Sequence, residues 1–176
     1  MIRRSQLLLS SIDVVSPRHG GGIHRGLRKT ARPIVTRRPM HITMRAGCAT
    51  GPLSLLYGKH PKIVRGLLGR LSRRYAVRVY RFSNNGNHCH LLVQARSRTG
   101  LQAFLRVFAG QIAQKITGAR KGAALGRRFW GETVFSRVVE WGRAFRTVLA
   151  YVRQNQLEAL GLVPYRPRTS RPLKKK

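Results

Sequence analysis

The chain of 176 residues carries 36 lysines and arginines but only 4 acidic residues, which gives a formal net charge of +32. Self-repulsion of this size destabilises a compact protein, so the charge favours a polyanionic partner, and the many arginines suit the phosphates and bases of nucleic acid. The length fits one domain, no apolar run reaches the roughly 18–20 residues of a membrane span, and the two cysteines exclude a disulfide framework or a zinc finger.

Both ends of the chain are predicted to be basic and without regular structure. Residues 1–37 contain a triple glycine, prolines and many arginines but no lasting periodicity, and residues 163–176 are similar. Such arms commonly become ordered on a phosphate backbone, although a solvated tail of no consequence is the alternative. The predicted DNA-binding residues of the arms and loops are Arg25, Arg28, Lys29, Arg37, Arg38, Arg120, Lys121, Arg127 and Arg128.

The globular part is predicted to span residues 38–162 and to begin with a strand over 40–45. Pro61 then opens a helix with an apolar stripe, since proline is favoured at a first helical position. A second strand over 77–83 and a third over 88–95 follow. They are joined by an Asn-Gly hairpin turn, because these residues tolerate positive φ.

The second half of the globular part predicts two more helices and one more strand. Ser97 or Thr99 caps a helix that ends near Thr117. A glycine-rich basic loop leads to a strand over 133–139 and then to a helix over 141–160.

This order of elements indicates an α+β fold with a ferredoxin-like βαββαβ sheet and an additional C-terminal helix. In that topology the first and third strands are central neighbours. The strand over 88–95 should therefore be central and rigid, with His41 on the strand beside it.

Two histidines stand one residue apart on the predicted central strand. Because successive strand side chains point to opposite faces, His88 and His90 should project from one face, opposite Cys89. Two imidazoles at this spacing can share one divalent metal ion. The alternative is a pair of half-buried or solvent-facing strand histidines without a ligand.

Three segments carry a resemblance to a known family. The run Phe82-Ser-Asn-Asn-Gly-Asn-His-Cys-His-Leu-Leu-Val93 resembles the "NHxHLLV" signature of the HUH single-tyrosine transposases. Arg128-Phe129-Trp130 and Tyr151-Val-Arg-Gln-Asn155 resemble the branch of REP-associated tyrosine transposases. The resemblance covers roughly residues 38–160.

The resemblance implies a transposase that cleaves and joins single-stranded or hairpin DNA. Its histidines and a third polar ligand would hold Mg²⁺ or Mn²⁺, which polarises the scissile phosphate. A tyrosine on the helix after the histidine strand would attack and form a 5′-phosphotyrosine link. A homodimer remains open, and the expected location is the cytoplasm, in association with the nucleoid.

The chain departs from this family where the nucleophile is expected. Aligning residues 105–117 on the family's helix places Ile112 at the tyrosine position, and no tyrosine occurs in that helix. Ile112 also fits the apolar stripe of a core-facing helix. Tyr151, which matches a structural position of the family's last helix, and Tyr57, in a loop, are weaker alternatives as nucleophile.

The third metal ligand is left open between residues of two segments. Gln111 and Gln114 lie on the same predicted helix and offer amide oxygens, but either could be a solvated helix residue. Glu132 is a further candidate, although it could instead pair with Arg127 or Arg128.

Three functions are consistent with the sequence. The first is a metal-dependent transposase or single-strand DNA endonuclease that uses an unexpected tyrosine or water as nucleophile. The second is a non-catalytic, domesticated DNA-binding descendant. The third, which the charge alone suggests, is a ribosomal-type RNA-binding protein, but such a role gives no reason for paired histidines.

Overall fold

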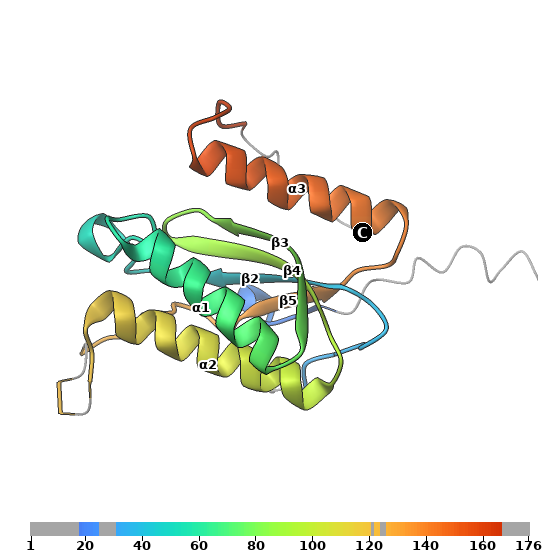
Figure 1. Ribbon diagram of the computed structural model, residues 1–176, viewed down its shortest axis with the longest axis horizontal. Helices are drawn as coiled ribbons and strands as arrows, with labels where there is room; N and C mark the ends of the chain where they lie inside the picture. Colours follow the sequence, from blue (N-terminus) through green and yellow to red (C-terminus); the bar gives the residue numbers. More distant parts are fainter. Residues whose placement is uncertain (1–17, 25–30, 121, 124–125, 167–176) are drawn as a thin grey trace, which may run out of the picture.

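The computed structural model describes residues 18–24, 31–120, 122–123 and 126–166 (Figure 1). The strands are β1 (Arg18–His19), β2 (Met40–Arg45), β3 (Val77–Asn84), β4 (His88–Ala95) and β5 (Phe135–Val138). The α-helices are α1 (His60–Arg74), α2 (Arg98–Thr117) and α3 (Arg143–Ala159), and short 3-10 turns cover Gly21–His24 and Gly51–Leu53.

The described strands form one antiparallel sheet in the order β1-β5-β2-β4-β3. Strands β2 to β5 have the ferredoxin-like arrangement, so the predicted fold class is confirmed. Strand β4 lies between β2 and β3, and Thr43 of β2 is paired with His90. The histidine strand is therefore central, as the topology required.

Local sequence signals set the ends of the main elements. The Ser97 hydroxyl accepts a hydrogen bond from the Gly100 amide and caps α2, and Gly118 ends that helix in the left-handed conformation. Gly86 in the β3–β4 turn has a φ of +83°, and a Cβ there would stand 3.1 Å from the Ser54 hydroxyl. A glycine therefore suits this turn both in conformation and in space.

The helices cover opposite faces of the sheet. Helices α1 and α2 lie together on one face, and α3 crosses the other (Figure 1). Cys89, Leu91 and Val93 of β4 are buried in the core against α1 and α2, whereas Leu92 packs with Val148 and Val152 of α3. The alternation of β4 thus sends the histidines toward α3 and away from α2.

Burial on the α1–α2 side is complete at Cys89. It raises the pKa of the Cys89 thiol to about 12, so this cysteine is an inert core residue on the face opposite the histidines.

The segment expected to be an arm contributes to the domain where it is described. Strand β1 pairs with β5 and extends the sheet by one strand. Ile34 packs against the core, and Arg32 donates hydrogen bonds to the Ser136 hydroxyl and the Val134 carbonyl. This pairing covers the edge of β5, which would otherwise expose unpaired backbone groups.

Several predicted DNA-binding residues lie outside the described residues, namely Arg25, Arg28, Lys29 and Lys121. No described helix combines the length and apolar character needed to cross a membrane.

Candidate active site between the central strands and the last helix

The two histidines of β4 lie side by side on the face that α3 covers. The centroids of the His88 and His90 rings are 4.9 Å apart and the ring planes are nearly perpendicular, at 86°. His90 is buried and His88 is half-buried. A rigid central strand therefore holds two imidazoles side by side, which a shared ion requires.

Both histidines are held by hydrogen bonds at Nδ1. The Nδ1 atom of His88 lies 2.6 Å from Asn87 Oδ1, and Nδ1 of His90 lies 3.0 Å from Thr43 Oγ1. A histidine that binds metal commonly engages its other ring nitrogen in such a bond, which fixes the direction of the ring. The geometry therefore suits coordination through Nε2.

His41 extends the cluster from the neighbouring strand, where the topology had placed it. Its ring stacks on the His90 ring with centroids 5.4 Å apart, and its Nε2 is 3.3 Å from His90 Nδ1. Burial, together with the nearby positive charge of Arg137, lowers the pKa of His41 to about 4. His41 is thus neutral at pH 7 and adds no positive charge beside the other two rings.

Tyr151 reaches this cluster from α3. Its ring centroid is 5.3 Å from that of His90 and 5.8 Å from that of His41, both in edge-to-face contact. Val148 and Val152 on the same side of the helix pack against Leu92 and set the position of α3. The phenol is therefore held against the histidines by the packing of an entire helix.

The side chains open into two adjoining cavities of about 440 and 380 Å³. Thr43, His90, Phe135 and Tyr151 line both of them. The first also contacts His41, Arg18 and Arg137, and the second contacts His88, Arg45 and Glu132. The cleft thus combines imidazoles, a phenol and guanidiniums, and the last of these suit an anionic substrate.

Asn155 lies one helical turn beyond Tyr151 and was not among the predicted site residues. Its Nδ2 donates to the Tyr151 carbonyl, and its Oδ1 accepts from Asn85 Nδ2 at 3.4 Å. The backbone N–H of Asn85 in turn donates to the His88 carbonyl, so Asn155 lies beside the hairpin from which His88 projects. The signal in the sequence was the spacing of four residues, which puts Tyr151 and Asn155 on one side of a helix.

The structure does not bring the predicted helix residues to the histidines. Ile112 is completely buried among the core residues on the opposite face of the sheet. Gln111 accepts a hydrogen bond from Arg70 of α1, and Gln114 is exposed. The alignment that put the nucleophile and third ligand on α2 therefore conflicts with the side of the sheet that α2 occupies.

The remaining predicted residues also have clear places. Tyr57 is exposed in the loop before α1 and contacts His60, not the histidine pair. Glu132 lines the cavity that contains His88 and His90. Arg37, Arg120, Arg127 and Arg128 are exposed, and Arg38 forms an ion pair with Glu140.

The candidate ligands for a divalent cation are two imidazoles and one amide oxygen. Within the described ranges, no cluster of three or more His, Cys, Asp or Glu side chains is placed to hold a metal ion. Two imidazoles with the amide oxygen of Asn155 nevertheless offer three neutral donors, and imidazole and carbonyl oxygen are both ligands of first-row divalent ions. The residues present are chemically suited to Mn²⁺ or Mg²⁺.

One known protein family matches the part of the chain that carries most of the site. The family described as "Transposase IS200 like" matches residues 52–155, which is more than half of the chain. The matched segment includes both histidines and extends through Tyr151 to Asn155. No curated protein matches the chain.

Two solved structures are similar to this chain. One is a REP-associated tyrosine transposase bound to a REP hairpin, with a TM-score of 0.56, 14% identity, and coverage of 78% of this chain and 76% of that chain. The other is a candidate transposase from Deinococcus radiodurans R1, with a TM-score of 0.44, 15% identity, and coverage of 73% and 98%. The first likeness shows the same fold.

Proposed function

Because the chain belongs to the IS200-like transposase family, we propose that it is a metal-dependent endonuclease that cleaves and rejoins single-stranded DNA, with Tyr151 as its nucleophile. One observation carries the proposal. The Tyr151 ring lies against His90, on the one face of the sheet from which both strand histidines project. A phenol beside paired imidazoles is the chemistry that covalent phosphoryl transfer needs.

Two histidines and one asparagine would bind the metal ion. His88 and His90 through Nε2, with Asn155 through Oδ1, would hold Mg²⁺ or Mn²⁺. When bound, the ion supplies Lewis-acid polarisation of the scissile phosphate. The Nδ1 contacts of His88 with Asn87 and of His90 with Thr43 keep both imidazoles oriented toward the cleft.

Tyr151 performs the bond exchange. Its hydroxyl oxygen attacks the phosphorus, a bond from the phenol oxygen to phosphorus forms, and the bond to the 3′ oxygen breaks. The phenol proton passes to water, the leaving 3′ oxygen takes up a proton from water, and the released strand carries a 3′ hydroxyl. Attack of a 3′ hydroxyl on the phosphotyrosine reverses the step and restores Tyr151, so the phosphodiester energy is conserved in the covalent link.

The charge of the cleft supports DNA as substrate. Arg18, Arg45 and Arg137 line the two cavities beside the histidines, within a chain of net charge +32. The related REP-associated structure is bound to a REP hairpin. By that analogy, we propose a hairpin as the feature that positions the cleavage point in this protein's DNA.

A covalent adduct assay tests the proposal directly. Wild-type protein is incubated with hairpin DNA carrying single-stranded flanks and Mn²⁺, and the adduct is mapped by mass spectrometry. Attachment at Tyr151, abolished in Tyr151→Phe and retained in the control Tyr57→Phe, supports the assignment. DNA binding by the wild type without any adduct would instead favour the non-catalytic descendant, and an adduct at Tyr57 would move the nucleophile.

A further inference from the structure

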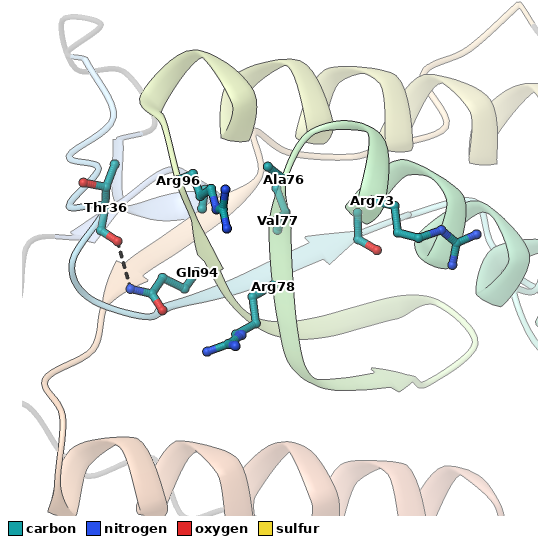
Figure 2. A pocket seen from close by; sticks show the side chains of 9 residues that line it. Thr36, Arg73, Ala76, Val77, Arg78, Gln94 and Arg96 are labelled. Atoms are coloured by element: carbon teal, nitrogen blue, oxygen red, sulfur yellow. Dashed lines mark hydrogen bonds between the residues drawn. The ribbon is translucent and has the colours of Figure 1, made fainter.

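A basic cavity of about 530 Å³, whose lining side chains are drawn in Figure 2, lies at the end of β4 opposite to the histidines. Thr36, the end of α1, the start of β3 and the end of β4 contribute to its walls. Arg78 and Arg96 lie close to Gln94 in this view, and Arg73 comes from the last turn of α1. The histidine site and this cavity therefore occupy opposite ends of the same strand, β4.

The guanidiniums of this cavity are exposed and lack carboxylate partners. Arg73, Arg78 and Arg96 form no ion pair within the described part of the chain. Arg78 and Arg96 lie beside Gln94, whereas the Arg73 side chain extends away from them (Figure 2). Unpaired cations on a concave surface concentrate positive potential, and arginine forks bind phosphate oxygens in pairs.

Hydrogen bonds fix the wall from which Arg78 projects. Gln94 donates from Nε2 to the Thr36 carbonyl and accepts at Oε1 from the Tyr80 hydroxyl at 2.6 Å. The Arg78 guanidinium lies over the Tyr80 ring, 5.9 Å from its centroid. Tyr80 thus orients both the glutamine and one of the arginines, so part of the ordering cost is already met before a ligand binds.

An exposed tryptophan adjoins this wall. Trp141 contacts Tyr80 and Phe145 with ring centroids 5.9 and 5.0 Å away, and its Nε1 donates to the Arg37 carbonyl. Because the neighbouring Thr36 carbonyl is bound by Gln94, the tryptophan and the cavity are tied to consecutive residues. Trp141 is nevertheless 48% exposed, more than a purely structural aromatic anchor requires. A fixed, half-exposed indole beside arginines is a surface on which a base can stack.

From these observations we infer a second DNA-binding site, in which Arg78 and Arg96 bind backbone phosphates and Trp141 stacks on an unpaired base. The inference rests on the proposed function, because the ligand of this second site is the DNA that Tyr151 cleaves. It adds a place where the same DNA molecule is held far from the cut.

The span between the two sites defines the DNA that can reach both. Strand residues rise by about 3.3 Å each, so the six residues from His88 to Gln94 cover about 20 Å and the eight to Arg96 about 26 Å. A duplex rises about 3.4 Å per base pair, so this span matches roughly six to eight base pairs. Duplex DNA that ends about four base pairs from the cleavage point should occupy only the histidine site.

Binding of long and short DNA separates the two sites. Fluorescence anisotropy is measured with the full chain carrying Tyr151→Phe, which prevents covalent attachment, on DNA whose duplex extends about ten or about four base pairs from the cleavage point. Arg78→Ala/Arg96→Ala should weaken binding of the long DNA by about tenfold and make the log–log salt slope shallower by about one for each phosphate that is no longer bound. Binding of the short DNA should change little.

The matched control removes the same charge elsewhere. Lys62 and Arg65 are exposed on α1, away from the cavity, so Lys62→Ala/Arg65→Ala should reduce binding of both DNAs slightly and equally. If the cavity variant behaves like this control, or weakens the short DNA as strongly as the long, the second site is overturned. If wild-type protein binds neither DNA, both this site and the proposed function are overturned.

The nature of the bound segment is read from Trp141 itself. In a Trp130→Phe background, Trp141 is the remaining tryptophan. A long single-stranded flank should quench its fluorescence, whereas a fully duplex extension should bind the arginines without quenching. Absence of quenching by either long DNA would refute the stacking role of Trp141.

Discussion

Tyr151 of α3 meets His90 of β4 edge to face, with ring centroids 5.3 Å apart, although the two residues come from different layers of the fold. The contact depends on how α3 packs on the sheet, because Val148 and Val152 of that helix pack against Leu92 of β4. Catalysis should therefore be sensitive to buried residues that only position the helix.

Shortening Val152 tests this dependence. Val152 of α3 is fully buried against Leu92, so Val152→Ala should lower the free energy of unfolding by about 1–3 kcal/mol and allow the phenol to shift. Adduct formation should fall at least tenfold, since a displacement of about 1 Å can cost 10²-fold in rate. Val64→Ala, in the core on the other face, serves as control. It should be destabilised to a similar degree and keep adduct formation, and an equal fall of activity in both variants would point to general destabilisation.

The metal role of the histidines is tested by calorimetry with Mn²⁺. His88→Ala and His90→Ala should each reduce affinity by at least ten- to hundredfold, because each removes a donor from a set of three. Asn155→Ala should weaken the site and Asn155→Asp should restore it, since a carboxylate oxygen can replace an amide oxygen. His60 is a buried histidine whose Nδ1 contacts the Ser54 carbonyl, so His60→Ala is the control and should leave Mn²⁺ affinity unchanged. Unchanged Mn²⁺ binding in His88→Ala would contradict the site assignment.

Much of this site could be predicted from local patterns. The alternation of β4 separates Cys89 from His88 and His90, and the order of elements identifies β4 as a central strand next to His41. Both conclusions depend only on the two-residue period of a strand and on the topology, and the structure agrees with them.

The contact between Tyr151 and the histidines was harder to predict from the sequence. Helical periodicity shows that a helix buries one side, but it does not tell which face of a sheet the helix covers. Yet three apolar residues of β4, Cys89, Leu91 and Val93, lie on the face opposite the histidines. That face must meet the helices of both βαβ units, because right-handed crossovers place the two helices on the same side of the sheet. That reasoning excludes α2 from the histidine face and leaves α3, the helix that carries Tyr151.

Strand β1 shows a different limit of sequence reasoning. Two residues are too few to display a period, and their basic composition matches that of an arm. They become a strand because the edge of β5 offers backbone partners, which is a tertiary effect.

Two truncations of the basic N-terminal segment should therefore have different effects on stability. Removal of residues 1–37 deletes β1, the Arg32 hydrogen bonds and the Ile34 packing, so it should lower both stability and DNA affinity. Removal of residues 1–17 should leave the free energy of unfolding nearly unchanged and make the salt dependence of DNA binding shallower. Urea unfolding and anisotropy measure the two effects, and equal stability of both truncated proteins would show that β1 contributes nothing.

The pH dependence of stability should report the buried His41. Its pKa is about 4 in the folded protein and near 6.5 when unfolded, so the unfolded chain binds more protons between these values. Stability is therefore complete above about pH 6.5 and is lost as the pH falls toward 4, by up to roughly 3 kcal/mol. Urea unfolding without metal at pH 7.5 and 4.5 measures the loss. His41→Gln should reduce it, and an identical pH profile in that variant would mean that another group is responsible.

Placing a tyrosine at position 112 distinguishes the two possible helices for the nucleophile. Ile112 is completely buried in the core that α1 and α2 cover, so Ile112→Tyr overfills this core at a cost of about 1–3 kcal/mol and leaves a hydroxyl unpaired at a similar cost. Thermal unfolding should show this loss. The double variant Ile112→Tyr/Tyr151→Phe should form no covalent DNA adduct, because the new phenol lies on the far side of the sheet from His88 and His90. Recovery of an adduct at position 112 in this double variant would place the reacting phosphate on the α2 face and contradict the assignment of Tyr151.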